Sequence, residues 1–224
     1  KLFIKQRVIM NTKEIIELEN KFGAKNYKPL DVVLEKGKGI WVWDVEGNKY
    51  MDCLAAYSAV NQGHCHPKII KKMKEQLDKL CITSRAFRND QLSLFYKDIC
   101  NLTHSHMVLP MNSGAEAVET VIKAVRKWGY TTKNIDEGKA EIIVCENNFH
   151  GRTTTVISFS NDEDARKNFG PYTAGFVKIP YNDTDALAKA LEDNNVAGFM
   201  VEPIQGEAGV FVPDEGYLDK CAAM

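Results

Sequence analysis

The sequence predicts an α/β protein with a mostly parallel sheet flanked by helices, preceded by an irregular amino-terminal segment. Two observations support this fold class. Apolar runs of strand length alternate with helical segments over the second half of the chain, and this alternation is typical of parallel strands joined by right-handed crossovers. One such run, 141–145, contains four consecutive apolar residues, as expected for a strand buried on both faces.

The first part of the chain predicts helices and one hairpin. A helix is expected over 12–22, and a hairpin over 37–51, where 45–48 forms the turn between runs rich in aromatic and β-branched residues. Apolar residues at helical spacing predict further helices over 67–80 and 91–102.

The second part predicts the alternating strands and helices. The polar segment 130–139 is expected to be a surface loop. We expect strands near 106–110 and over 141–145, 175–179 and 196–202, with helices over 114–129, just beyond 151, over 183–193 and from about 215.

The helix at 114–129 has the features of an anion-binding turn. Ser113 and Glu116 have the spacing of a capping box, which predicts that the helix begins at or beside Ser113. Gly114 lets an oxyanion approach the backbone, where first-turn N–H groups carry partial positive charge. The pattern therefore favours a phosphate site, although an ordinary capped helix explains it equally well.

The residues after the strand at 141–145 form a second candidate site. Asn148 and Gly151 suit a sharp turn, and ligands of open parallel sheets gather beyond the carboxyl ends of the strands. Phe149 and Arg152 would then lie at this edge as an aromatic surface and a cation. Taken singly, each is also compatible with a structural role, Phe149 as a cap on the core and Arg152 as a solvated cation.

Composition excludes several classes of protein. The chain has 224 residues, of which 44% are hydrophobic and 26% are charged, close to globular averages. A net charge of −1 predicts no nucleic-acid or anionic membrane partner, and no apolar run approaches the roughly 20 residues that span a bilayer. The six cysteines are scattered without a CxxC pair, which favours thiols in a reducing compartment.

Two histidine pairs raise the question of a metal. His64 and His66 are two residues apart, as are His104 and His106. Two ligands do not complete a zinc site, which usually has four. The sequence therefore predicts no bound metal.

Taken together, these segments resemble the class III aminotransferases, which are pyridoxal-phosphate-dependent enzymes of fold type I. The resemblance runs from about Lys21 to Gly216. It implies an amino-terminal segment over 1–66 and part of the large cofactor-binding α/β domain over 67–224, without the family's carboxyl-terminal domain. Its marks are the segments 22–30, 37–44, 57–67, 83–87, 112–117, 126–130, 148–152 and 201–210.

The resemblance also implies which residues contact the cofactor, pyridoxal 5'-phosphate. Ser113, Gly114 and Ala115 match the phosphate-binding turn, and Phe149 matches the aromatic residue that stacks on the pyridine ring. Glu202 matches a residue that supports the polar network of the cofactor. The family's cofactor-anchoring lysine follows the position of Met224, so no catalytic residue is predicted within this chain.

The resemblance further implies a substrate site. Arg152 matches the arginine that holds the donor's carboxylate, and Tyr27 the residue that meets its α-amino group. Tyr57 matches an aromatic wall, and Glu207 a carboxylate that pairs with an arginine of the later domain.

Within this resemblance, mainly Tyr27, Tyr57 and the segment 84–87 favour ornithine as the amine donor, with 2-oxoglutarate as the acceptor, giving glutamate 5-semialdehyde and glutamate. The alternatives are acetylornithine or 4-aminobutyrate as the donor, or a non-catalytic binding or scaffold role.

The resemblance implies small-molecule partners, namely an amino-acid and a 2-oxo-acid substrate, together with a second copy of the chain in a homodimer. Neither nucleic acid nor a membrane is expected. The segment 1–10 is basic and partly apolar but lacks the serine- and arginine-rich character of a transit peptide. The cytoplasm is therefore the expected location, with the mitochondrial matrix as the alternative.

Overall fold

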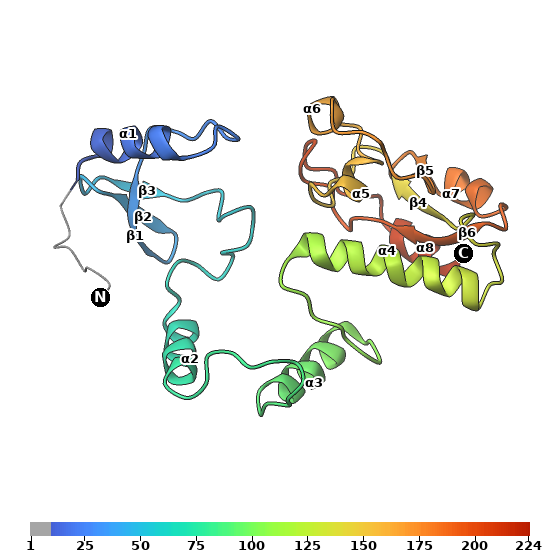
Figure 1. Cartoon of the computed structure of the whole chain (residues 1–224), viewed down its shortest axis with the longest axis horizontal. Helices are drawn as coiled ribbons and strands as arrows, with labels where there is room; N and C mark the ends of the chain where they lie inside the picture. Colours follow the sequence, from blue (N-terminus) through green and yellow to red (C-terminus); the bar gives the residue numbers. More distant parts are fainter. Residues whose placement is uncertain (1–9) are drawn as a thin grey trace. The chain divides into compact units, whose positions relative to one another are not determined.

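The computed structural model describes residues 10–224 and comprises two compact units (Figure 1). Their boundary in the sequence lies between Phe95 and Tyr96. The predicted boundary between residues 66 and 67 stays a prediction. Except for Met10, the basic segment 1–10 lies outside the described residues.

The first unit begins with helix α1 (Thr12–Phe22), as predicted. Asn11 and Glu14 form a capping box, in which each side chain accepts the other's backbone N–H at 3.0 Å. The box satisfies two N–H groups that have no partner within the helix. The hydroxyl and N–H of Thr12 donate to the carboxylate of Glu46, which fixes the start of α1 to a turn of the following sheet.

That sheet has three antiparallel strands in the order β1-β2-β3, namely β1 (Leu34–Lys38), β2 (Trp41–Asp44) and β3 (Lys49–Met51). The predicted hairpin over 37–51 is present, and β1 extends it by one strand. The β2–β3 turn is closed by the buried carboxylate of Asp44, which accepts hydrogen bonds from the N–H and side-chain amide of Asn48, both at 2.8 Å, and from the Tyr50 hydroxyl at 2.7 Å.

Two helices follow the antiparallel sheet. Helix α2 (Pro67–Leu77) starts with a proline, whose missing N–H costs nothing at this position. It ends before the predicted residue 80 because the N–H groups of Lys79 and Leu80 both turn back to the Gln76 carbonyl at 3.0 Å. Helix α3 (Leu92–Thr103) agrees with the prediction to within one residue at each end and runs from the first unit into the second.

The second unit is built on a parallel sheet, as the alternation of apolar segments predicts. Strand β4 (Glu141–Cys145) lies between β5 (Phe176–Ile179) and β6 (Val196–Met200) and pairs with both in parallel. Ile143 and Val144 of β4 are fully buried, so the prediction of a strand covered on both faces is confirmed.

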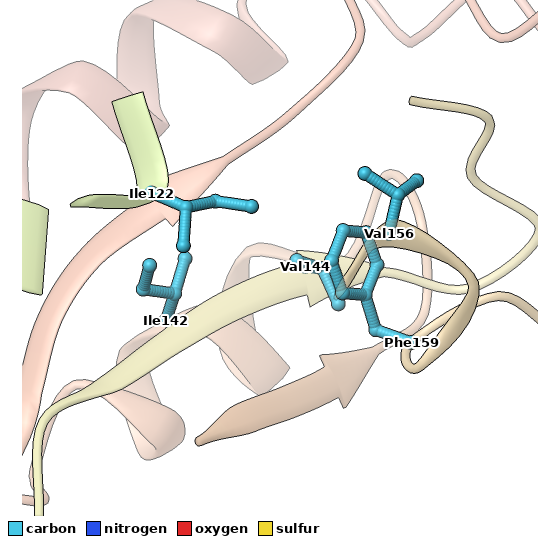
Figure 2. Close-up of a cluster of buried hydrophobic side chains, with 5 residues drawn as sticks. All are labelled: Ile122, Ile142, Val144, Val156 and Phe159. Atoms are coloured by element: carbon cyan, nitrogen blue, oxygen red, sulfur yellow. The ribbon is translucent and has the colours of Figure 1, made fainter. Parts of the chain in front are cut away.

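Helices cover the two faces of this sheet. On one face, Ile122 of α4 (Gly114–Thr131) belongs to a cluster with Ile142 and Val144 of β4, Val156 of α5 (Thr154–Ile157), and Phe159 (Figure 2). On the other face, buried residues of the sheet pack with residues of α7 (Thr184–Ala190) and α8 (Tyr217–Ala223). A short helix, α6 (Glu163–Arg166), completes the unit.

The strand predicted near 106–110 is wrong. This segment is irregular, and its Met107 and Leu109 side chains are exposed. A strand is stable only when its backbone pairs with a neighbour, and neither sheet of the described residues includes this segment. No described helix combines the length and apolar character needed to cross a membrane.

Candidate functional site

The amino-terminal end of α4 has the open geometry that anion binding requires. Ser113 is the N-cap and accepts the N–H of Glu116 at 3.2 Å. The first-turn N–H groups of Gly114 and Ala115 have no partner within the helix. A Cβ atom added at Gly114 would meet no atom within 4 Å, so a ligand can reach the backbone there.

Only half of the predicted capping box forms at this helix. The Glu116 carboxylate accepts the N–H of Asn112 at 2.8 Å, one residue before the N–H that a capping box would use. It also accepts the Asn112 side-chain amide at 3.3 Å. The prediction that α4 begins beside Ser113 is nevertheless confirmed.

The loop after β4 folds back onto the start of α4. The buried Asn148 side chain donates to the carbonyls of Cys145 at 2.6 Å and Phe159 at 3.3 Å, which holds the loop against the sheet. Gly151 has φ +123°, and a Cβ atom there would lie 3.3 Å from the Cβ of Ala115. The two candidate sites therefore lie side by side.

Glu202, which follows β6, joins this loop to the neighbouring strand. Its carboxylate accepts the N–H of Phe149 at 3.2 Å. Burial raises the pKa of the Glu202 carboxyl, although hydrogen bonds from the Phe149 N–H and the Gln205 side chain act in the opposite direction. Gln205 also donates to the Glu146 carbonyl at 2.8 Å, so both ends of the loop are held from the β6 side.

A pocket of about 370 Å³ opens beside the loop. Its wall includes Phe149, a residue that is 40% exposed, and the oppositely charged Arg152 and Glu207. One wall of the pocket can therefore cover a flat ring, and Arg152 brings a guanidinium, a group suited to binding carboxylates, to the same pocket. The remaining lining residues include Asn147, Asn148, His150, Gly151, Asn161 and Ala208.

His150 contributes to the wall of the pocket and also lies near the buried Phe159. Its ring centroid lies 6.0 Å from that of Phe159, and its buried Nε2 has no hydrogen-bond partner. Burial lowers the pKa of this imidazole, which favours the neutral form.

Sequence reasoning missed a contact between α4 and Thr153, the residue after Arg152. Glu119 has the spacing of a helix ion pair with Lys123, but its carboxylate accepts the Thr153 hydroxyl at 2.5 Å. Thr153 is also the N-cap of α5 and follows Arg152 directly. The spacing of Thr153 to α5 could have identified a cap, but no local signal identifies a partner 34 positions away.

The predicted site residues are divided between the two units. Ser113, Gly114, Ala115, Phe149, Arg152, Glu202 and Glu207 belong to the second unit, where the contacts above bring them together. Tyr27 and Tyr57 belong to the first unit and are 58% and 71% exposed. Their place in the site stays a prediction. No group of three or more metal-ligating side chains occurs within residues 10–224.

Known proteins share both the sequence and the fold of this chain. The family model "Aminotransferase class-III" matches residues 22–224. The chain is 58% identical over 207 residues to an ornithine aminotransferase of Brevibacillus brevis, covering 92% of this chain and 52% of that protein. It is 58% identical over 201 residues to an ornithine aminotransferase of Bordetella pertussis, covering 90% and 49%. The chain thus spans about half the length of the curated relatives it matches.

Solved structures agree with this similarity. The ornithine aminotransferase of Toxoplasma gondii ME49 superposes with a TM-score of 0.92 at 44% identity, over 96% of this chain and 51% of that chain. An acetylornithine aminotransferase of Elizabethkingia anophelis gives a TM-score of 0.82 at 58% identity, over 95% and 52%.

Proposed function

The chain belongs to the class III aminotransferase family, and from this premise we propose that the protein, at the full length of its relatives, is a pyridoxal-phosphate-dependent ornithine δ-aminotransferase. It would transfer the δ-amino group of ornithine to 2-oxoglutarate, giving glutamate 5-semialdehyde and glutamate. The observation that carries the proposal is the close approach of Gly151 to Ala115, where a Cβ atom added to Gly151 would lie 3.3 Å from the Cβ of Ala115. That contact brings the open start of α4 beside the loop that carries Phe149 and Arg152.

The residues present fit the proposed cofactor. A phosphate can accept the N–H groups of Gly114 and Ala115, because the space above Gly114 is open. Phe149 offers a half-exposed ring face to the pyridine. Glu202 accepts the N–H of Phe149 and so anchors the backbone of the loop that carries that ring. When bound, pyridoxal phosphate supplies a carbonyl for the donor amine and a conjugated ring that delocalises negative charge.

The residues of this chain bind and orient the donor. We assign the donor's carboxylate to Arg152, whose planar guanidinium can donate two parallel hydrogen bonds. Tyr27 would meet the α-amino group, and Tyr57 would form the wall that directs the distal amine to the cofactor. Glu207 lies in the same pocket as Arg152. We propose that Glu207 pairs with an arginine of the later part of the enzyme. This pairing would mask the later arginine while the amino donor is bound and release it to bind the 2-oxo acid.

A donor panel tests this assignment. The full-length protein, loaded with pyridoxal phosphate and given 2-oxoglutarate, should use ornithine with a higher kcat/KM than N-acetylornithine or 4-aminobutyrate. Arg152→Ala should lower kcat/KM for ornithine at least about 100-fold, since two charge-assisted hydrogen bonds of roughly 1.5–3 kcal/mol each are lost. For a monoamine without a carboxylate, kcat/KM should fall only slightly in Arg152→Ala.

The matched controls for Arg152→Ala are Arg152→Lys, which keeps the charge but not the fork, and Lys127→Ala, which removes an exposed cation of α4. Equal losses for ornithine and the monoamine would remove Arg152 from carboxylate binding.

Acetylornithine is the second candidate donor, because a solved structure described as an acetylornithine aminotransferase is 58% identical to this chain. Preference for N-acetylornithine over ornithine in the same panel would establish that alternative. A homodimer and a cytoplasmic location, with the mitochondrial matrix as the alternative, also belong to the proposal. The six cysteines are free thiols, which supports a reducing compartment.

A further inference from the structure

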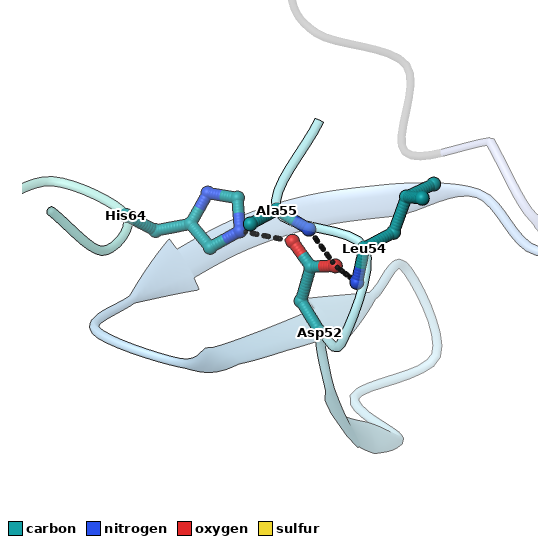
Figure 3. A network of polar contacts seen from close by, with 4 residues as sticks. All are labelled: Asp52, Leu54, Ala55 and His64. Carbon is teal, nitrogen blue, oxygen red and sulfur yellow. Dashed lines mark hydrogen bonds and ion pairs between the residues drawn. The ribbon is translucent and has the colours of Figure 1, made fainter. Parts of the chain in front are cut away.

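Asp52 and His64 close a loop of the first unit (Figure 3). One carboxylate oxygen of Asp52 accepts the N–H groups of Leu54 at 3.0 Å and Ala55 at 2.9 Å. The other oxygen lies 2.7 Å from Nε2 of His64. A single carboxylate therefore holds the start of the segment 53–63, here called the tyrosine loop, and links it to the residue at its end.

The antiparallel sheet fixes both ends of the tyrosine loop. The N–H of Asp52 donates to the Ile40 carbonyl at 2.9 Å, and His64 exchanges two backbone hydrogen bonds with Gly39 at 2.8 and 2.9 Å. The His64 side chain packs closely over Gly37, where an added Cβ would come within 2.8 Å of the His64 Cβ. The loop ends therefore have little freedom.

The tyrosine loop itself has a strained backbone. Ala55, Ala56, Tyr57 and Ser58 have φ values of 50°, 49°, 54° and 69°. Residues other than glycine rarely adopt this left-handed conformation, and a run of four is costly. Such a run persists only when surrounding contacts impose it, and the side-chain contacts at its start are the two hydrogen bonds to Asp52.

We propose that Asp52 and His64 are positioning residues for the amine donor, acting by fixing the tyrosine loop and with it Tyr57. This inference rests on the proposed function, in which Tyr57 forms the wall beside the distal amine. The Ala55 N–H, followed by His64, lowers the pKa of the Asp52 carboxyl, so the charged acceptor is present at neutral pH. Loss of the Asp52–His64 contact should weaken donor binding and leave the acceptor 2-oxo acid less affected.

The test compares disruptive and conservative variants of the full-length protein loaded with pyridoxal phosphate. Asp52→Ala and His64→Ala remove the contacts. Asp52→Asn keeps an acceptor for the Leu54 and Ala55 amides, and His64→Gln keeps a polar atom near the Nε2 position. Glu17→Ala is the control, because Glu17 lies on the exposed surface of α1, where its carboxylate forms a weak helix ion pair with Lys13 at 3.9 Å.

Two quantities are measured, the hydrogen-exchange rates of the Leu54 and Ala55 amides and the steady-state constants for the donor. In Asp52→Ala we expect both amides to exchange at least about tenfold faster, because they lose a charged acceptor. KM for the donor should rise about tenfold, with a smaller change in kcat. Asp52→Asn and His64→Gln should keep the amide exchange rates and the KM for the donor close to the wild-type values. Glu17→Ala should resemble the wild type in both.

A double-mutant cycle tests whether the effect passes through Tyr57. In a Tyr57→Ala background, Asp52→Ala should add little to the KM for the donor, because the wall is already absent. A full additional increase in KM would overturn the proposal, as would unchanged amide exchange in Asp52→Ala. If Asp52→Ala does not fold, the comparison of His64→Ala with His64→Gln decides the same question.

Failure of this inference is separable from failure of the proposed function. The kinetic constants are measured with whichever amine donor the wild type uses best. A wild type that prefers another amine contradicts the ornithine assignment but leaves the test of the tyrosine loop intact. Normal use of ornithine together with unchanged KM in both alanine variants contradicts only the positioning role.

Discussion

Replacing Gly151 with alanine tests the contact that joins the two halves of the candidate site. Gly151 has φ +123°, a conformation that alanine rarely adopts, and its new Cβ would lie 3.3 Å from the Cβ and 3.7 Å from the Cα of Ala115. Backbone strain of about 1–3 kcal/mol would add to an overpacking cost of about 1 kcal/mol or more. We therefore expect a loss of roughly 2–4 kcal/mol in the free energy of unfolding.

The matched control is Gly138→Ala. Gly138 also has a positive φ, +81°, but a Cβ there would meet no atom within 4 Å. The free energy of unfolding of this variant should fall by only about 1–2 kcal/mol, the cost of the left-handed backbone. The difference in unfolding free energy between the two variants measures the combined effect of the contact with Ala115 and the less favourable φ of Gly151.

Calorimetric unfolding and a titration with pyridoxal phosphate measure the two consequences of Gly151→Ala. The variant should melt at a lower temperature than Gly138→Ala and bind the cofactor at least about tenfold more weakly, a change of about 1.4 kcal/mol, because the Phe149 loop moves away from the start of α4. The reasoning is refuted if both variants lose equal stability and Gly151→Ala keeps the wild-type affinity for the cofactor.

Three further predictions concern the polar groups around the site. Thr153→Val should lose about 1–3 kcal/mol of unfolding free energy, because the Glu119 carboxylate loses its hydroxyl donor and the Val156 N–H at the start of α5 loses its acceptor. Thr153→Ser should retain most of it, and equal melting of the two variants would exclude this role. Glu202 has a folded-state pKa above its usual 4.5, so the folded state binds the extra proton and its stability should decline as pH rises from about 4.5 through the folded pKa. Glu202→Gln should flatten that decline in pH-dependent denaturation, and an unchanged slope would contradict it. Burial raises the pKa of the Cys145 thiol to about 11, so at pH 7.5 iodoacetamide should modify the exposed Cys53 well before Cys145; mass spectrometry showing early labelling of Cys145 would be inconsistent with the structure.

Strong local patterns made several elements predictable. The apolar run 141–145 identifies β4 as a buried central strand, because only a strand covered on both faces tolerates so few polar residues. Ser113 identifies the start of α4, because capping is a local interaction. Strand β1, with the sequence LEKGK, has no apolar alternation and could not be recognised before its pairing with β2 was known.

Long-range partners were the least predictable features. The segment 106–110 is apolar enough to suggest a strand, but its pairing depends on neighbours distant in the chain. Glu119 has a plausible helix partner in Lys123, yet it contacts Thr153. His64 stands out in the sequence only as one of a histidine pair, and it meets Asp52 because the sheet brings the ends of one loop together.

The most direct test of the central claim is a crystal structure of the full-length protein grown with pyridoxal phosphate. We predict that the phosphate oxygens accept the N–H groups of Gly114 and Ala115 and that the Phe149 ring covers the pyridine ring. A cofactor bound elsewhere, with the start of α4 holding only solvent, would contradict the account.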